Sequence, residues 1–73
     1  MKILVLSSLN ELSKELKIER KRLGLTQWEV AERSYTGRET VRTAEAGKYT
    51  PHLDTILAIA KALGYDEIHF KIG

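Results

Sequence analysis

The 73-residue chain lacks cysteine altogether, and this absence excludes disulfide bonds and thiolate metal sites. None of its apolar runs approaches the roughly 20 residues of a membrane span. The apolar run at residues 3–6 is also too short for a secretory signal, and no small-residue cleavage site follows it. We therefore expect a mature chain that stays in the cytoplasm.

Groups that serve enzyme chemistry are also scarce. The sequence has two histidines and no glycine-rich loop for binding a phosphate. His52 and Asp54 stand two residues apart at a predicted helix start, so their side chains diverge, and His69 falls on an outward position of a predicted strand. We therefore expect no catalytic residue, no metal site and no cofactor.

Length and charge narrow the classes of protein that remain possible for this chain. Residues 1–73 are enough for one domain but not for two, and the thin core of such a domain favours dimerisation. The net charge is +2, but nine Lys or Arg stand against six Glu between residues 14 and 48, which leaves that stretch at +3. This basic middle attracts phosphate at long range, although a solvated surface of mixed charge would give the same count.

Apolar spacing and turn-forming residues predict four helices. A capping box at Ser8 and Glu11 opens the first helix. Thr26 caps the second helix, and Thr50 caps the fourth, with Pro51 at its first helical position. The predicted helices cover about residues 9–23, 27–33, 38–46 and 51–63, and the buried stripe of the last one comprises Leu53, Ile56, Leu57, Ala60 and Leu63.

Both ends of the chain have strand-like patterns. Residues 3–6 are either a strand or an apolar tail, and residues 66–72 predict a strand with Ile68, Phe70 and Ile72 on one face. An edge strand exposes unpaired backbone groups and tends to find a partner. That partner is either the N-terminal run or a second copy about a two-fold axis, and both pairings fit within one sheet. We expect the C-terminal strand to make a dimer.

The predicted helix at residues 38–46 combines a small core with many long polar side chains. Val41 and Ala44 are its only apolar pair at helical spacing. The major groove of B-form DNA admits one helix, and an arginine can bond a guanine edge in two places. The local pattern therefore fits either a helix that reads a groove or an ordinary surface helix.

Three ordered motifs carry a family resemblance. They are Gly24-Leu25-Thr26-Gln27-x-Glu29-x-Ala31, then Val41-x-x-Ala44-Glu45-x-Gly47-Lys48, then Pro51-x-Leu53-Asp54-Thr55-Ile56-Leu57-x-Ile59-Ala60-Lys61-Ala62-Leu63-Gly64. Over about residues 16–64 the chain resembles the Cro and phage-repressor (XRE) helix-turn-helix family. The resemblance implies a mainly α, lambda-repressor-like bundle of four to five helices, followed here by a short C-terminal β-strand.

The resemblance also implies a DNA-binding site on the helix at residues 38–46, which would lie in the major groove. It places a phosphate contact at the start of the preceding helix and backbone contacts in the loop that follows. It further implies a structural salt bridge between Arg20 and Glu45. The implied DNA-binding residues are Gln27, Trp28, Gly37, Arg38, Glu39, Thr40, Arg42, Thr43, Lys48 and Tyr49.

Some residues depart from the family pattern. Gly37 stands where a Ser or Thr cap is usual, and Thr36 is an alternative cap that would start the helix one residue earlier. Glu39 could accept a hydrogen bond from a cytosine amino group; otherwise it repels phosphate, or pairs with Arg42 or Arg38. Trp28 replaces a polar residue and would lie on the DNA backbone, against a partner protein, or half-buried on the monomer.

The resemblance implies a sequence-specific transcriptional repressor that binds double-stranded DNA, with a palindromic operator and a homodimer. The short C-terminal strand resembles that of HipB-like antitoxins. Such a role would add a kinase-like toxin as partner and autoregulation of a toxin–antitoxin operon. The alternatives are a phage-type Cro or repressor lysogeny regulator, and a protein-interaction module without DNA readout.

Overall fold

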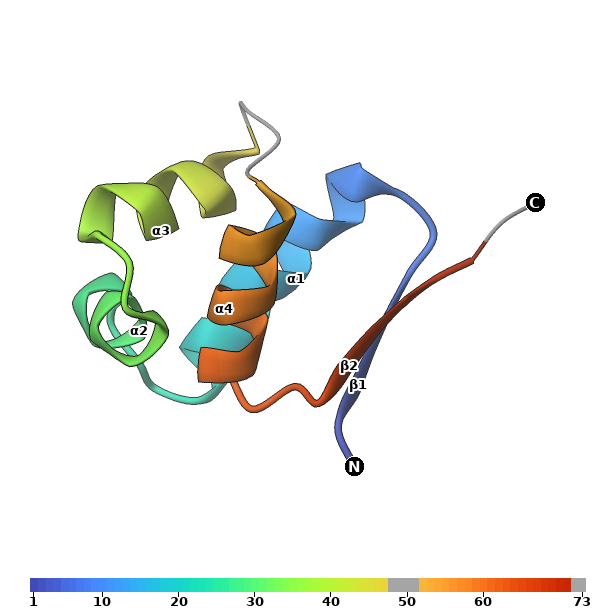
Figure 1. The fold of residues 1–73 in the computed structure, drawn as a ribbon, viewed down its shortest axis with the longest axis horizontal. Helices are drawn as coiled ribbons and strands as arrows, with labels where there is room; N and C mark the ends of the chain where they lie inside the picture. Colours follow the sequence, from blue (N-terminus) through green and yellow to red (C-terminus); the bar gives the residue numbers. More distant parts are fainter. Residues whose placement is uncertain (48–51, 72–73) are drawn as a thin grey trace.

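Helices form a small bundle with a two-stranded sheet on one side (Figure 1). The computed structural model describes residues 1–47 and 52–71. Its elements are β1 (Ile3–Leu6), α1 (Leu9–Arg22), α2 (Gln27–Ser34), α3 (Arg38–Ala46), α4 (Leu53–Ala62) and β2 (Glu67–Phe70). The mainly helical class with a short C-terminal strand is therefore confirmed. No helix in the described part of the chain is long and apolar enough to cross a membrane.

One apolar core holds these elements together. Helix α2 packs against both α3 and α4, and α1 packs against α3. The side chains of Ala31 and Ala44 are small and buried, which allows the helices to approach closely where they meet. The largest fully buried side chains come from β1, from each of the four helices and from the residue directly after α4. They are Leu6, Leu16, Val30, Val41, Ile59 and Leu63.

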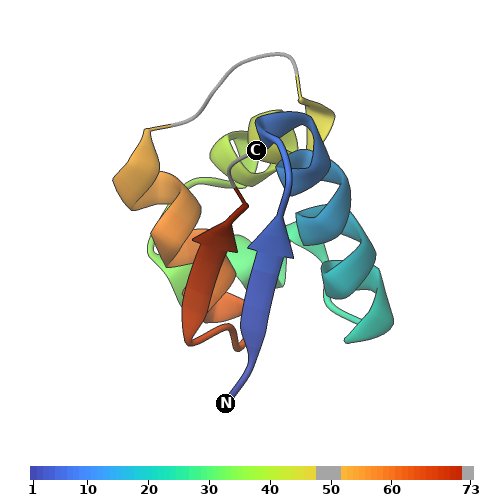
Figure 2. The same ribbon diagram turned by 90° about the vertical axis from the view of Figure 1, so that its right-hand side faces the viewer.

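The two strands pair in parallel, with Leu6 opposite Phe70. Leu4 and Leu6 are buried while Val5 between them is exposed, which is the alternation of a half-buried strand. Residues 3–6 are therefore a strand rather than an apolar tail, and the internal pairing with the C-terminal strand is confirmed. Figure 2 shows the sheet in front of the helices, with no described element over its outer face.

Helix α4 differs from the sequence prediction at its start and in its buried face. It begins at Leu53, with His52 preceding its first turn, whereas the predicted start at Thr50 and Pro51 lies outside the described residues. Leu53 and Leu57 are 65% and 48% exposed, so their predicted burial is wrong. This helix carries two apolar stripes, and its docking against α2 selects one of them: Ile56, Ile59, Ala60 and Leu63.

The start of α1 also differs from the prediction. The Ser8 side chain makes no capping hydrogen bond, and the Glu11 carboxylate accepts from the backbone N–H of Ser7 instead, at 3.1 Å. The predicted capping box is therefore wrong. The chain arrives at this helix directly from β1, and this path brings the Ser7 N–H rather than the Ser8 N–H within reach of Glu11.

A buried ionic cluster, which no sequence pattern predicted, joins the N-terminus to the ends of α1 and α4. Glu19 is buried and pairs with Lys2 and Arg22, and both of its oxygens accept from Arg22 at 2.6 Å. The Lys2 ammonium also donates to the Leu63 carbonyl at 2.7 Å and lies 4.4 Å from the centre of the Tyr65 ring. The cluster thus fixes the chain just before β1.

The cluster predicts a loss of stability in acid. Hydrogen bonds from Arg22, with a smaller contribution from Lys2, lower the pKa of Glu19 from 4.5 to about 2. A carboxyl group whose pKa is lower in the folded than in the unfolded state stabilises the fold at pH values above its unfolded pKa. This stabilisation is lost as the pH falls from about 4.5 to about 2. We expect Glu19→Gln to lose on the order of 2 kcal/mol at neutral pH, allowing for the exposure of Arg22.

Urea unfolding at several pH values measures this effect. The Glu19→Gln variant should be less stable than the parent near neutrality, and the difference should shrink as the pH approaches about 2. A constant difference between the two proteins across this range would contradict the assignment to Glu19.

Candidate nucleic-acid interface

Helices α2 and α3 make a helix-turn-helix with a short connection. Helix α3 spans Arg38–Ala46, as predicted. Gly37 precedes its first turn in an extended conformation without a side-chain cap, and Thr36 is not the cap, because its hydroxyl lies 2.8 Å from that of Ser34. At the other end, Gly47 has a φ of 71°, the left-handed conformation in which glycine commonly ends a helix.

The turn before α3 contains a left-handed residue that is not glycine. Tyr35 has a φ of 57° and a fully exposed side chain. The preceding Ser34 belongs to α2 and is buried, where its hydroxyl donates to the carbonyl of Val30 at 2.7 Å. This internal hydrogen bond lets a polar residue occupy a packed position at the end of α2.

The outer face of α3 is free of the rest of the protein. Val41 and Ala44 are buried against the bundle, while the side chains of Arg38, Glu39 and Arg42 are exposed. Thr40 and Thr43 are half-buried at the margins of this face. Helix α3 lies on the side of the molecule away from the sheet (Figure 1). The structure therefore presents the predicted base-contacting residues together on one open surface.

Two of these residues form an ion pair along the helix. Arg42 Nε lies 3.0 Å and 3.1 Å from the two carboxylate oxygens of Glu39, and Arg42 Nη2 also donates to Glu39. Their side chains are 63% and 73% exposed. These hydrogen bonds lower the pKa of Glu39, so its carboxylate stays ionised and paired. Of the options for Glu39, the structure shows pairing with Arg42.

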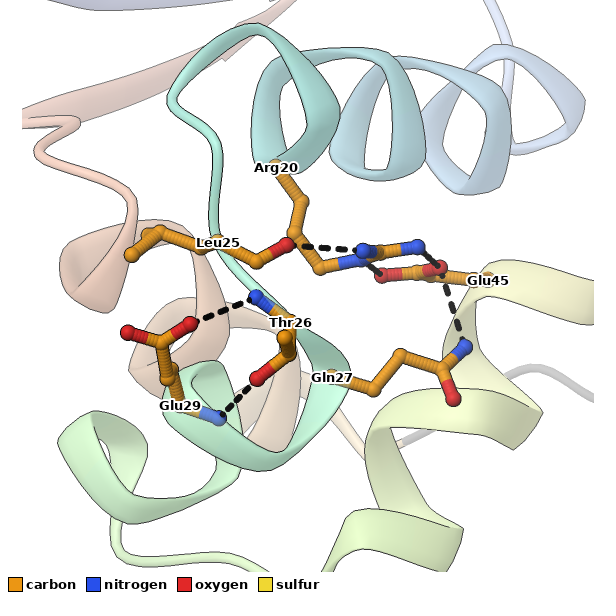
Figure 3. Close-up of polar contacts among 6 residues, drawn as sticks. All are labelled: Arg20, Leu25, Thr26, Gln27, Glu29 and Glu45. Atoms are coloured by element: carbon orange, nitrogen blue, oxygen red, sulfur yellow. Dashed lines mark hydrogen bonds and ion pairs between the residues drawn. The ribbon is translucent and has the colours of Figure 1, made fainter.

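A second ion pair, between Arg20 and Glu45, is buried behind the helix-turn-helix (Figure 3). Arg20 Nε lies 2.6 Å from Glu45 Oε2, and Arg20 Nη2 lies 3.0 Å from Glu45 Oε1. Arg20 Nη1 donates to the Leu25 carbonyl at 2.9 Å. The predicted salt bridge between α1 and α3 is present, and it also holds the chain that leads into α2.

Gln27 belongs to the same network. Its Nε2 donates to Glu45 Oε1 at 3.2 Å, which turns the amide toward α3 (Figure 3). One amide hydrogen stays available beside the N-terminus of α2, where backbone N–H groups favour an anion. A capping box of Thr26 and Glu29, with both hydrogen bonds at 3.0 Å, fixes this helix start. The arrangement suits a phosphate contact by a positioned amide.

Of the other predicted contact residues, the structure describes Trp28 but not Lys48 and Tyr49. Trp28 lies in the first turn of α2 with 58% of its surface exposed, which is compatible with a half-buried side chain on the monomer. Two residues that are not among the predicted DNA contacts, His52 and Thr55, line a shallow groove with Glu39, Thr40 and Thr43 beside α3. Only the packing of α4 against the helix-turn-helix brings them there.

The described part of the chain contains no group of three His, Asp or Glu residues arranged to hold a metal ion. Among the described residues, the interface presents guanidinium, amide, hydroxyl, carboxylate and indole groups. Arginine and amide groups in this setting bond base edges and phosphate oxygens.

Comparison with known proteins places the chain in a family. Residues 16–70 match the family described as "Helix-turn-helix". An HTH-type transcriptional regulator of Methanothermobacter thermautotrophicus is 49% identical over 49 residues, which are 67% of this chain and 71% of that protein.

Solved structures with the same fold include two restriction-modification controller proteins. C.AhdI from Aeromonas hydrophila is 31% identical, with a TM-score of 0.73, over 80% of this chain and 88% of that one. A tyrosine-to-alanine mutant of C.Esp1396I is 24% identical, also with a TM-score of 0.73, over 80% of this chain and 75% of that one. The chain therefore belongs to the helix-turn-helix family of the Cro and phage-repressor type, a family of DNA-binding transcription regulators.

Proposed function

We propose that this protein is a sequence-specific DNA-binding repressor that inserts α3 into the major groove. The observation that carries this proposal is the open face of α3, on which Arg38 and Arg42 stand clear of the bundle. A groove about 12 Å wide accepts one helix with its side chains. The rest of α3 is fixed by burial of Val41 and Ala44 and by the Glu45 network, so the helix can enter the groove as a rigid element.

The contacts divide into two kinds. Arg38, Glu39, Arg42 and Thr43, flanked by Gly37 and Thr40, face base edges in this proposal, and Gln27 binds phosphate at the start of α2. Trp28 lies along the DNA backbone next to Gln27. Lys48 and Tyr49, which follow α3 in the sequence, add contacts to the DNA backbone. Base contacts specify sequence, whereas phosphate contacts fix position without regard to sequence.

This division predicts different consequences for two substitutions. Arg42→Ala should weaken binding to the preferred duplex by about 10- to 100-fold and affect other sequences little, because a bidentate arginine discriminates bases. Gln27→Ala should weaken binding to all duplexes alike. Titrations by fluorescence anisotropy, against a duplex selected from a random library and against a mixed-sequence duplex, measure both.

The same titrations decide between DNA readout and a protein-interaction module. Phosphate contacts make the logarithm of the binding constant fall steeply with the logarithm of salt concentration. Binding of the parent protein to no duplex, or binding without salt dependence, would exclude the repressor function. A loss at a single base on Gln27→Ala would contradict its phosphate role.

We also infer a homodimer through β2, with a palindromic operator. The edge of β2 opposite β1 has no partner in the described chain, and an unpaired edge strand readily adds another strand. Phe70 is half-exposed on that strand. Leu53 and Leu57 expose further apolar surface on α4, and Leu57 lines a groove that also includes Ile68 of β2. Ile72, the third predicted interface residue, lies outside the described residues.

The dimer has a direct test in sedimentation. Deleting residues 67–73 should yield monomers with much weaker DNA binding. Since β2 also pairs with β1, Phe70→Lys is the milder variant, because it places a charge in the interface without removing the strand. Val5→Lys is the matched control, at an exposed position on the outer face of the same sheet. A dimer that persists in both Phe70→Lys and the deletion variant would rule out β2 as the dimer element.

A HipB-like antitoxin is the finer role that we propose within this function. It rests on the short strand that follows the helix-turn-helix and would bring a kinase-like toxin as partner and autoregulation of the operon. The phage-type lysogeny regulator is the alternative, and the likeness to C.AhdI adds a restriction-modification controller. The genes beside this one separate the three, since a kinase-like frame, phage genes or a restriction-modification pair would each favour one role.

A further inference from the structure

The carboxylate of Glu39 is unexpected on the open face of α3. Of the two acids in this helix, Glu45 is buried in the network with Arg20, whereas Glu39 faces solvent among the groups that would meet DNA. A negative charge in this position lowers the attraction to every duplex. A side chain that opposes binding to all sequences alike therefore requires another role on this face.

Folding stability gives a weak reason for the Glu39–Arg42 pair. Both side chains are mostly exposed, and exposed ion pairs contribute little because solvent and salt screen them. An acid in the first turn of a helix also interacts favourably with the helix dipole, but this effect does not require a bidentate arginine. The geometry of the pair is more specific than either effect demands.

The pair leaves one end of the Arg42 guanidinium free. Glu39 is bound by Nε and Nη2, which form the side of the guanidinium. The opposite end, made by the outer hydrogens of Nη1 and Nη2, has no protein partner among the contacts of the described residues. Two parallel donors at this end match the O6 and N7 acceptors of guanine. A side-on carboxylate therefore orients the arginine without blocking base readout.

This inference rests on the proposed function and adds a role for one residue. We propose that Glu39 is a positioning residue for base readout, which holds Arg42 side-on so that its free end meets a guanine. The same carboxylate cancels the charge of Arg42, and this weakens binding to duplexes that offer only phosphate contacts. Selectivity arises because a fixed arginine gains from guanine without first losing conformational freedom, while its pairing removes part of the general attraction.

The test compares Glu39→Gln with the parent protein. The probes are a duplex selected from a random-sequence library with the parent, and a mixed-sequence duplex of equal length. We expect the ratio of the two affinities to fall by about tenfold in Glu39→Gln, through weaker binding to the selected duplex and tighter binding to the mixed one. The affinity of Glu39→Gln for the mixed duplex should fall more steeply with salt than that of the parent, because its binding face carries one more net positive charge.

Glu11→Gln is the matched control. Glu11 is an exposed carboxylate that accepts a hydrogen bond from the Ser7 backbone N–H at 3.1 Å, and it lies in α1, outside both α3 and the dimer strand β2. This variant should keep the parent's ratio of affinities. Urea unfolding of all three proteins separates a folding defect from an effect on binding.

Other results would overturn the positioning role of Glu39. An unchanged ratio in Glu39→Gln, or an equal fall in Glu11→Gln, would overturn the positioning role while leaving the proposed function in place. Selection with Glu39→Gln provides a second readout. If the variant loses a preference for cytosine but keeps the guanine preference, Glu39 contacts a base itself and does not position Arg42. If the parent selects no duplex, the proposed function fails and this inference fails with it.

Discussion

Glu45→Ala should destabilise the protein by about 3–5 kcal/mol, the range for breaking a buried ion pair by removing one partner. The two side chains are 11% (Arg20) and 4% (Glu45) exposed. Without the carboxylate, Arg20 keeps a buried positive charge with a single carbonyl, that of Leu25, as acceptor. Gln27 loses its acceptor as well, so we also expect weaker DNA binding.

This loss is large relative to the total free energy of unfolding of the protein. A domain of 73 residues has a free energy of unfolding of about 4–11 kcal/mol at typical stability per residue. Urea denaturation at 25 °C measures the change. Replacing Arg20 and Glu45 together by Met and Leu should recover much of the stability, because no unpaired charge is left in the interior.

Glu39→Ala is the matched control for Glu45→Ala. It breaks a side-on Arg–Glu pair on the same helix, but one that is exposed to solvent, so the urea midpoint should hardly move. Equal effects of the two substitutions would show that burial does not determine the importance of these pairs, contrary to our account of the network.

Leu6→Ala is the second large expected effect, with a loss of about 2–5 kcal/mol. Leu6 lies in β1 and is 0% exposed, among the largest fully buried side chains of the core. Its replacement removes apolar contacts and leaves a cavity that this small domain has few means of closing. The prediction tests whether the N-terminal strand belongs to the core.

Val5→Ala is the neighbouring control. Val5 precedes Leu6 in the same strand, but it points to the outer face and is 48% exposed. Its replacement should cost much less, since little buried surface is lost. Thermal unfolding of both variants measures the difference. A small effect of Leu6→Ala, similar to that of Val5→Ala, would mean that β1 contributes little to the folded state.

Local patterns predicted the helix-turn-helix closely. The bounds of α3, the cap at Thr26 and the left-handed Gly47 each follow from residues within a few positions of one another. Buried Val41 and Ala44 also follow from helical spacing. These features depend on backbone geometry and on short-range hydrogen bonds, and sequence reasoning describes such interactions well.

Predictions that depended on distant parts of the chain were less successful. The capping box at Ser8 is wrong because the path from β1 brings a different N–H to Glu11. Leu53 and Leu57 are exposed because α4 has two apolar stripes and its docking uses the other one. The cluster of Lys2 and Glu19 joins residues 17 positions apart, and no local pattern shows such a contact.

The sequence by itself determined where the helices of the helix-turn-helix begin and end, and it placed Arg38, Glu39 and Arg42 on one helix. The tertiary structure decided which face of each helix is buried, that β1 pairs in parallel with β2, and that His52 and Thr55 border the surface of α3. The physical reason is the separation along the sequence over which each kind of interaction acts. Capping and helical periodicity act over a few residues, whereas burial and ion pairing depend on which elements meet, and that is settled only when the whole core packs.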